Sequence, residues 1–160
     1  MHRIVCNVTT GETAIVNLTP EEVAAYQAAA IANFPNVKAA FIRQIDTDAD
    51  TLIRTVIGER SSEYELAEKE ATAYKTAGYI GAVPSSVSAW ATAKNWTATQ
   101  ATDSIVLAAT EWRSAQATMR AARLLCKEQG REAIDAAALD AIKAQWATVI
   151  TAIKLQLGVN

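Results

Sequence analysis

Histidine is almost absent from this chain, whose only one is His2. Nucleophile triads, histidine-rich metal sites and most general-base schemes need an imidazole held in a pocket. The phosphate-loop pattern GxxxxGK[ST], the dinucleotide pattern GxGxxG and the zinc pattern HExxH are also missing. The sequence therefore predicts no enzymatic activity, no catalytic residue, no cofactor and no metal.

Cysteine and long apolar runs are scarce as well. Cys6 and Cys126 stand alone, outside any CxxC motif, and we interpret both as small buried hydrophobes rather than a disulfide. No run approaches the ~18 apolar residues of a membrane-crossing helix, so we expect no membrane span. The first residues, MHRIVCNVTTGE, lack the apolar centre of a signal peptide. We expect the chain to stay in the cytoplasm where it is made.

An excess of positive charge is missing too. The net charge is −2, whereas a nucleic-acid partner calls for a basic face. The basic residues of the stretch 111–132 are interleaved with Glu111, Glu128 and Glu132, so we expect no nucleic-acid partner. The acidic stretch DTDAD lacks the downstream Gly and Glu of a calcium loop. We interpret it as a solvated helix face.

Apolar residues recur at steps of three and four over most of the chain, which predicts packed helices. The seam of a long helix from about Asn36 to Ala77 contains Ile42, Ile45, Ala49, Leu52 and Val56. A second helix, from Ala98 to about Gln129, has the seam Ala101, Ile105, Ala108, Trp112, Ala115, Met119, Ala122 and Cys126. A third starts at the cap Asp135 and has the seam Leu139, Ile142, Trp146, Val149, Ile153 and Leu157.

Before these helices, residues 3–18 read as a β-hairpin turned at Gly11. Apolar residues alternate on both sides of that turn: Ile4, Cys6 and Val8, then Ala14, Val16 and Leu18. A capping box formed by Thr19 and Glu22, with Pro20 in the first turn, starts a short helix. We expect that helix to end near Asn33, because Pro35 disfavours helical geometry in the residue before it.

The passage AGYIGAVPSSVSAWATAKNWTATQ, residues 77–100, is rich in aromatic and turn residues and predicts a corner between helices. The predicted fold is mainly α: an antiparallel three-helix bundle of long helices, plus a short N-terminal helix and an N-terminal β-hairpin. We divide the chain into a docking element, residues 1–35, and a helical bundle, residues 36–160.

This passage and the helix after it resemble a module of small bacteriophage tail and tail-fibre-associated proteins, of the form AGYxGxVPxxVxxWA. The matching positions are Ala77, Gly78, Tyr79, Gly81, Val83, Pro84, Val87, Trp90, Ala91, Thr97, Ile105, Trp112, Arg120, Arg123 and Leu124. The stretch CNVTTGETAIVNLTPEEVAAYQ is also similar to the start of short tail-fibre-associated proteins. The resemblance implies a place in the phage tail and brings no catalytic residues.

Three functions compete. The first is a structural component of the tail tip or baseplate, or an adaptor for the fibres, located in the virion and made in the host cytoplasm. The second is a tail-fibre assembly chaperone that is not retained in the virion. The third is an unrelated small enzyme, which the missing site chemistry disfavours. The expected partners are other phage tail or tail-fibre proteins, and a homo-oligomer is a further option.

A two-stranded hairpin is marginal alone and has open edges, so we expect residues 1 to about 50 to carry the main contact, with the hairpin adding to a partner's sheet. The Tyr79–Trp96 corner is the second choice. The candidate partner-binding residues are Ile4, Cys6, Val8, Val16, Leu18, Ile42, Ile45, Tyr79, Trp90 and Trp96.

Overall fold

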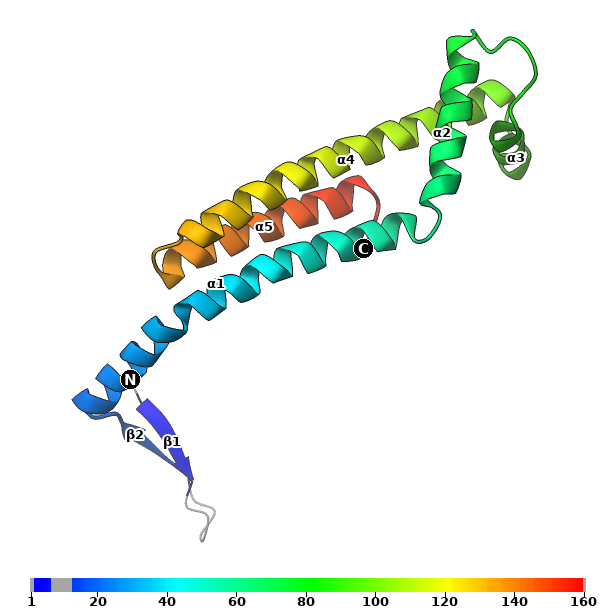
Figure 1. The fold of residues 1–160 in the computed structure, drawn as a ribbon. Helices are drawn as coiled ribbons and strands as arrows, with labels where there is room; N and C mark the ends of the chain where they lie inside the picture. Colours follow the sequence, from blue (N-terminus) through cyan, green and yellow to red (C-terminus); the bar gives the residue numbers. More distant parts are fainter. Residues whose placement is uncertain (1, 7–12, 160) are drawn as a thin grey trace.

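A computed structural model describes residues 2–6 and 13–159 of the chain (Figure 1). Two antiparallel strands, β1 (His2–Cys6) and β2 (Thr13–Asn17), are followed by five helices. The helices are α1 (Pro20–Ile57), α2 (Ser61–Thr76), α3 (Ser85–Lys94), α4 (Ala98–Glu132) and α5 (Ala136–Gln156). Helix accounts for 79% of the described residues, which confirms the mainly α class. The pairing of β1 with β2 confirms the N-terminal hairpin.

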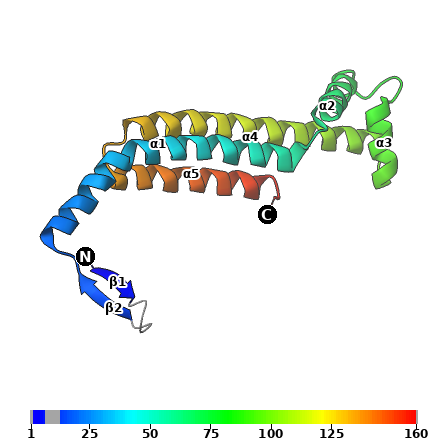
Figure 2. The ribbon, with the colours of Figure 1, turned by 60° about the horizontal axis from the view of Figure 1, so that its bottom comes forward.

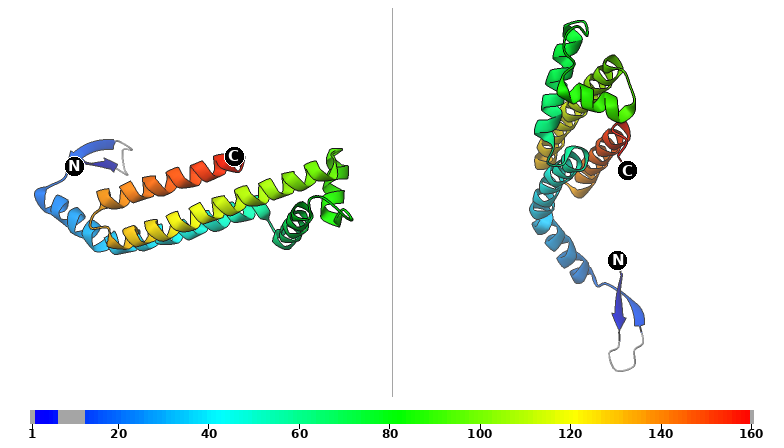
Figure 3. Two further views of the ribbon diagram at one scale, coloured as in Figure 1. Left: turned by 90° about the horizontal axis from the view of Figure 1, so that it is seen from above. Right: turned by 90° about the vertical axis from the view of Figure 1, so that its right-hand side faces the viewer.

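Helices α1, α4 and α5 lie side by side in every view (Figures 1–3). Helix α4 runs against α1, and α5 returns in the direction of α1. Their facing seams form the larger of two apolar clusters, which we call the main core. Its buried members are Phe41, Ile45, Ala49, Leu52, Ala115, Met119, Cys126, Ala133, Leu139, Trp146 and Ile153. The 3/4 spacing of apolar residues thus identified most of these contacts.

A second, smaller cluster lies at the far end of α4, where α2 and α3 pack against its first turns (Figure 1). Its buried side chains are Ala71, Val87 and Ala101, and Ile105 packs against them. We call it the distal core. Arg113 of α4 also forms an ion pair with Glu68 of α2 at 2.6 Å. Helix α4 therefore serves both cores, with its first half in one and its second half in the other.

Two of the predicted helix boundaries are wrong. The short helix does not end near Asn33, because α1 continues through Pro35 to Ile57. Pro35 is exposed, so the hydrogen bond that its ring removes lies at the surface, where solvent can replace it. The single helix expected from Asn36 to Ala77 is instead two. Gly58, at φ +61°, ends α1 and lets α2 leave in a new direction.

The second long helix was predicted to end at about Gln129, but α4 continues to Glu132, and Gly130 lies inside it and is buried. A Cβ atom there would lie 3.4 Å from Cδ1 of Phe41. The missing side chain therefore lets α1 approach α4 closely near its end. On the same side, Nζ of Lys38 donates to the carbonyl oxygens of Arg131 and Ala133, at 2.6 and 3.1 Å. A lysine of α1 thus caps the C-terminus of α4.

Candidate functional site

The first part of the molecule lies mostly outside both cores, and of its side chains Phe34 packs against the edge of the main core. We call it the arm: the hairpin, β1 and β2, together with residues 20–37 of α1. Figure 2 shows α1 bending where it leaves its neighbours, and the hairpin lying beyond that bend. The capping box at Thr19 and Glu22, expected from the sequence, is present and starts the helix of the arm. The arm is therefore ordered by local signals rather than by packing on the rest of the protein.

The hairpin pairs Ile4 with Ile15, so these two side chains share one face, and both are 72% exposed. Val16 lies opposite Arg3 on the other face and is also exposed. The apolar residues of the two strands thus do not gather on a single face. Arg3 forms an ion pair with Glu22 of α1 at 2.6 Å, between partly exposed side chains. Such pairs contribute about 0–1 kcal/mol, so the hairpin is only lightly attached.

Other candidate partner-binding residues are half-buried, fully buried or outside the described residues. Leu18 is half-buried. Val8, Gly11 and the side chain of Cys6 lie outside the described residues. Ile45 is fully buried and Ile42 is half-buried. Ile42 and Ile45 therefore do not form a free contact surface, because this part of α1 already packs against α4 and α5.

The corner between α2 and α4 contains the aromatic passage. Gly78 and Tyr79 both have left-handed backbone, at φ 71° and 62°, and Asn95 ends α3 at φ 55°. Trp90 and Trp96 are exposed by about two-fifths, and Nζ of Lys94 lies 4.8 Å and 6.0 Å from their ring centroids. The two tryptophans thus share one cation, an arrangement that holds both rings at the surface.

Tyr79 is half-buried, and its hydroxyl and ring contact other residues of the corner. Its hydroxyl donates to Oδ1 of Asp103 at 2.8 Å, and its ring meets Tyr74 edge to face at 5.9 Å. Lys75 donates to the same Asp103 oxygen at 2.7 Å. These hydrogen bonds, from Lys75 and then from Tyr79, lower the pKa of Asp103. The network ties α2 and the corner to α4.

Glu70 of α2 caps the start of α3. Its carboxylate accepts from the backbone N–H of Ser86 at 2.9 Å, and this bond lowers the pKa of Glu70. A carboxylate at a helix N-terminus satisfies a free donor and favours the helix dipole. The corner thus depends on two ionised carboxylates, those of Glu70 and Asp103.

We expect the corner to lose stability in acid. Both carboxylates have folded pKa values below their ordinary ones, so the folded form is favoured above the ordinary values, about 3.9 for Asp and 4.3 for Glu. That stabilisation disappears as the pH falls through the lowered, folded values. The midpoint temperature of thermal unfolding should therefore decrease once the pH is below about 4. In the D103N variant this decrease should be smaller. Thermal unfolding followed by circular dichroism checks this, with D50N controlling for the loss of one exposed carboxylate. An unchanged pH profile in D103N would contradict it.

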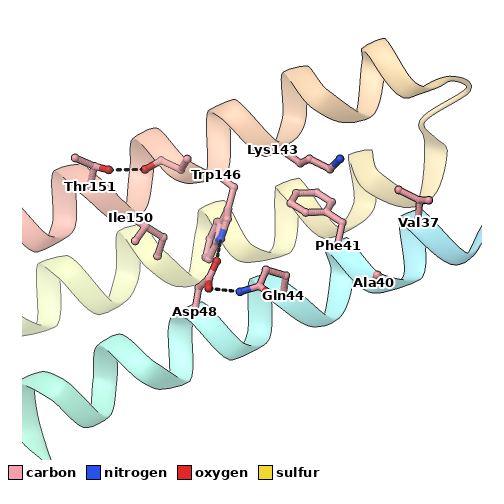
Figure 4. A pocket seen from close by; sticks show the side chains of 10 residues that line it. Val37, Ala40, Phe41, Gln44, Asp48, Lys143, Trp146, Ile150 and Thr151 are labelled. Carbon is pink, nitrogen blue, oxygen red and sulfur yellow. Dashed lines mark hydrogen bonds between the residues drawn. The ribbon is translucent and has the colours of Figure 1, made fainter. Parts of the chain in front are cut away.

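A shallow apolar groove lies between α1 and α5, and Figure 4 shows its lining. Asp48 is the polar centre of the groove, and both its oxygens are engaged. Oδ1 accepts from the Gln44 amide at 2.6 Å, and Oδ2 accepts from the indole N–H of Trp146 at 2.9 Å. Lys143 at the rim pairs with Asp140 at 2.8 Å. Of these contacts, the hydrogen bond between Trp146 and Asp48 joins α5 to α1. The polar groups of the groove are thus engaged and offer no free acid, base or nucleophile.

Among the described residues, no group of three or more His, Cys, Asp or Glu side chains is placed to hold a metal ion. Within the same part of the chain, no helix is both long and apolar enough to cross a membrane. The surfaces with functional potential are therefore the arm and, second, the exposed tryptophans of the corner.

Sequence reasoning missed the exposed apolar side chains on the helix of the arm, above all Tyr26 and Ile31. A signal for them was present, because the 3/4 spacing of α1 continues upstream of Pro35 through Phe34. Comparisons of the chain with models of protein families, with curated proteins and with solved structures found no match.

Proposed function

We propose that this chain is a structural component of a bacteriophage tail, either a tail-tip or baseplate protein or an adaptor for the fibres, and that it acts by protein–protein interaction. The resemblance of residues 73–128 to a phage tail module supports the place. The observation that carries the mode of action is the arm, a hairpin held away from both cores with its apolar side chains in solvent. On this proposal the protein is made in the host cytoplasm and becomes part of the virion tail.

The arm would dock by strand addition. In the described residues β1 and β2 pair only with each other, so each strand keeps one edge on which a strand of another tail protein can pair. Backbone hydrogen bonds would supply affinity, and side chains on one face would supply specificity. The pair Ile4 and Ile15 is the most apolar of the cross-strand pairs on its face of the hairpin. Edges left open in this way favour pairing with another chain.

The remaining helices would hold the arm at a fixed place. On this proposal α1, α4 and α5 are the antiparallel three-helix bundle expected from the sequence. Lys38 and Gly130 fix the point at which the arm leaves it. The corner with Trp90 and Trp96 is the second docking surface, because exposed tryptophans are favoured at protein interfaces.

A tail-fibre assembly chaperone that leaves before the virion is complete is the second candidate. The light attachment of the hairpin, through the Arg3–Glu22 ion pair, also suits a partner that binds and then releases. The copy number of the protein in purified virions separates the two candidates. A fixed number per particle supports the structural component, and absence from particles supports the chaperone.

Deletion of residues 1–18 should abolish co-purification with tail components, because it removes both strand edges and keeps the helix cap Thr19. The double variant I4K/I15K should weaken co-purification strongly, since it places two charges on the apolar face of the hairpin. Ala14 faces the opposite side in the register, so A14K is the matched control and should bind nearly as well as the unsubstituted protein. Capture of tail components at full level by the deleted chain would refute docking through the hairpin.

A further inference from the structure

The core-facing stripe of α1 does not end where its neighbours end. Inside the main core it presents Phe41 and Ile45, which are buried. Phe34, one heptad before Phe41, packs against the edge of the same core. Ala30 lies four residues further upstream, on the same face of the helix. Ile31, beside it, is 75% exposed. The stripe therefore continues into the arm as an apolar face.

Nothing in the described part of the chain covers this continuation. Among the helices, α1 packs against α4 and α5, and the turn between those two lies beside Lys38, whose ammonium binds the last carbonyls of α4. Upstream of that point α1 is the only helix, as both views of Figure 3 show. An apolar face that continues an established helix–helix interface and then lacks a partner marks a docking surface.

The composition of this face points to its occupant. Residues 23–37, VAAYQAAAIANFPNV, contain no charged side chain. Two copies of this segment can therefore approach without repulsion between like charges, and no charge on the segment selects a partner of opposite sign. On the face itself Ala30 is small, which lets two helix backbones come close together at that point.

We propose that this face of the arm helix, centred on Ala30, Ile31 and Phe34, binds the same face of a second copy of the chain. The same face takes part on both copies, so two arms related by a two-fold axis cover each other's apolar side chains. The assembly therefore stops at a dimer. The hairpin lies beyond the helix and its outer edges stay available, so the dimer stands apart from the proposed docking to a tail protein.

The dimer should be weak and reversible. Residues 23–37 span roughly four helical turns, which bury much less than the ~1,600 Å² of a standard stable interface. We therefore expect a dissociation constant in the micromolar range or above, roughly 1 µM to 1 mM. Association should be visible only in a concentration series of the full chain.

Sedimentation analysis of the full chain from about 5 to 500 µM tests the proposal. The unsubstituted protein should pass from monomer to dimer across this range. A30E places a charge on the proposed face and should raise the dissociation constant at least about tenfold. Ala29 is also exposed but lies on the opposite side of the helix. A29E, with the same change of residue and charge, should leave association nearly unchanged.

I31E should weaken the dimer at least as much as A30E, because it removes a large apolar side chain as well. All three positions are exposed in the single chain, so circular dichroism should show unchanged helix content and thermal midpoint in each variant. A protein that stays monomeric over the whole range would overturn the proposal. So would equal weakening by A29E and A30E, because the contact would then not involve this face.

Discussion

Replacing Trp146 with alanine should lower the free energy of unfolding by about 3–5 kcal/mol, the range typical of large-to-small changes of buried aromatics. Trp146 of α5 is 3% exposed and packs in the main core. Its indole N–H also donates to Asp48 at 2.9 Å, so truncation leaves a cavity and removes a partner of that carboxylate. Urea denaturation followed by circular dichroism measures the change.

Trp96 provides a matched control for this substitution. It is 42% exposed and belongs to neither core, so W96A should cost no more than about 1 kcal/mol. W146F should fall between the two, because it keeps most of the apolar volume and loses the hydrogen bond to Asp48. If W146A and W96A lowered the stability equally, the assignment of Trp146 to the main core would be wrong.

Replacing Val87 with aspartate should release α3 from α2 and α4. Val87 is fully buried. An aspartate at this position would place a carboxylate among apolar side chains, mostly alanine, that cannot neutralise its charge. Uncompensated burial of a charge costs several kcal/mol or more, and the distal core has only three buried members to oppose it. Amide hydrogen exchange should show loss of protection in residues 61–94.

The main core should survive that substitution, because the two cores share no buried residue. Protection of α5 and of the second half of α4 should therefore change little. Ser88, next in the chain and exposed, gives the matched control S88D, which should keep α3 in place. Simultaneous loss of protection in all helices of V87D would show that the two cores unfold as one unit.

The sequence predicted helix starts well because those signals are local. The capping box at Thr19 and the cap at Asp135 are each formed by residues within three positions of one another, and both are confirmed. The seam of α5 is confirmed for the same reason: its period of three and four is set by helix geometry alone. Local rules therefore gave the class of the fold and most of the main core.

Whether a proline or a glycine ends a helix was harder to predict, because it depends on residues that are distant in the sequence. Gly58 ends a helix with left-handed backbone, whereas Gly130 stays helical and makes room for Phe41. The two glycines look alike in the sequence, and the difference arises from a side chain that lies about 90 positions away in the chain. Pro35 was expected to end a helix, yet its exposed position lets α1 pass through it.

The candidate surfaces show the same difference between local signals and contacts of distant residues. The sequence placed the hairpin and the corner correctly as elements, but it did not show which apolar side chains are covered. Ile45 and Ile31 both lie on apolar stripes of α1, and one is buried while the other is exposed. Coverage is decided by where α4 and α5 end relative to α1, and that is a property of the assembled helices.

The order of the helices along the chain also governs how the protein is made. Helix α1 leaves the ribosome first, but α5, which completes the cover of its seam, ends roughly 100 residues later. At the usual translation rate of about 5–20 residues per second, Phe41, Ile45 and Leu52 face solvent for about 5–20 s. Until α4 is made, the apolar seam of α1 has no partner in the nascent chain, and until α5 is made its cover is incomplete. Chaperones of the cell that makes the protein, and neighbouring nascent copies of the same chain, therefore encounter α1 before α5 does.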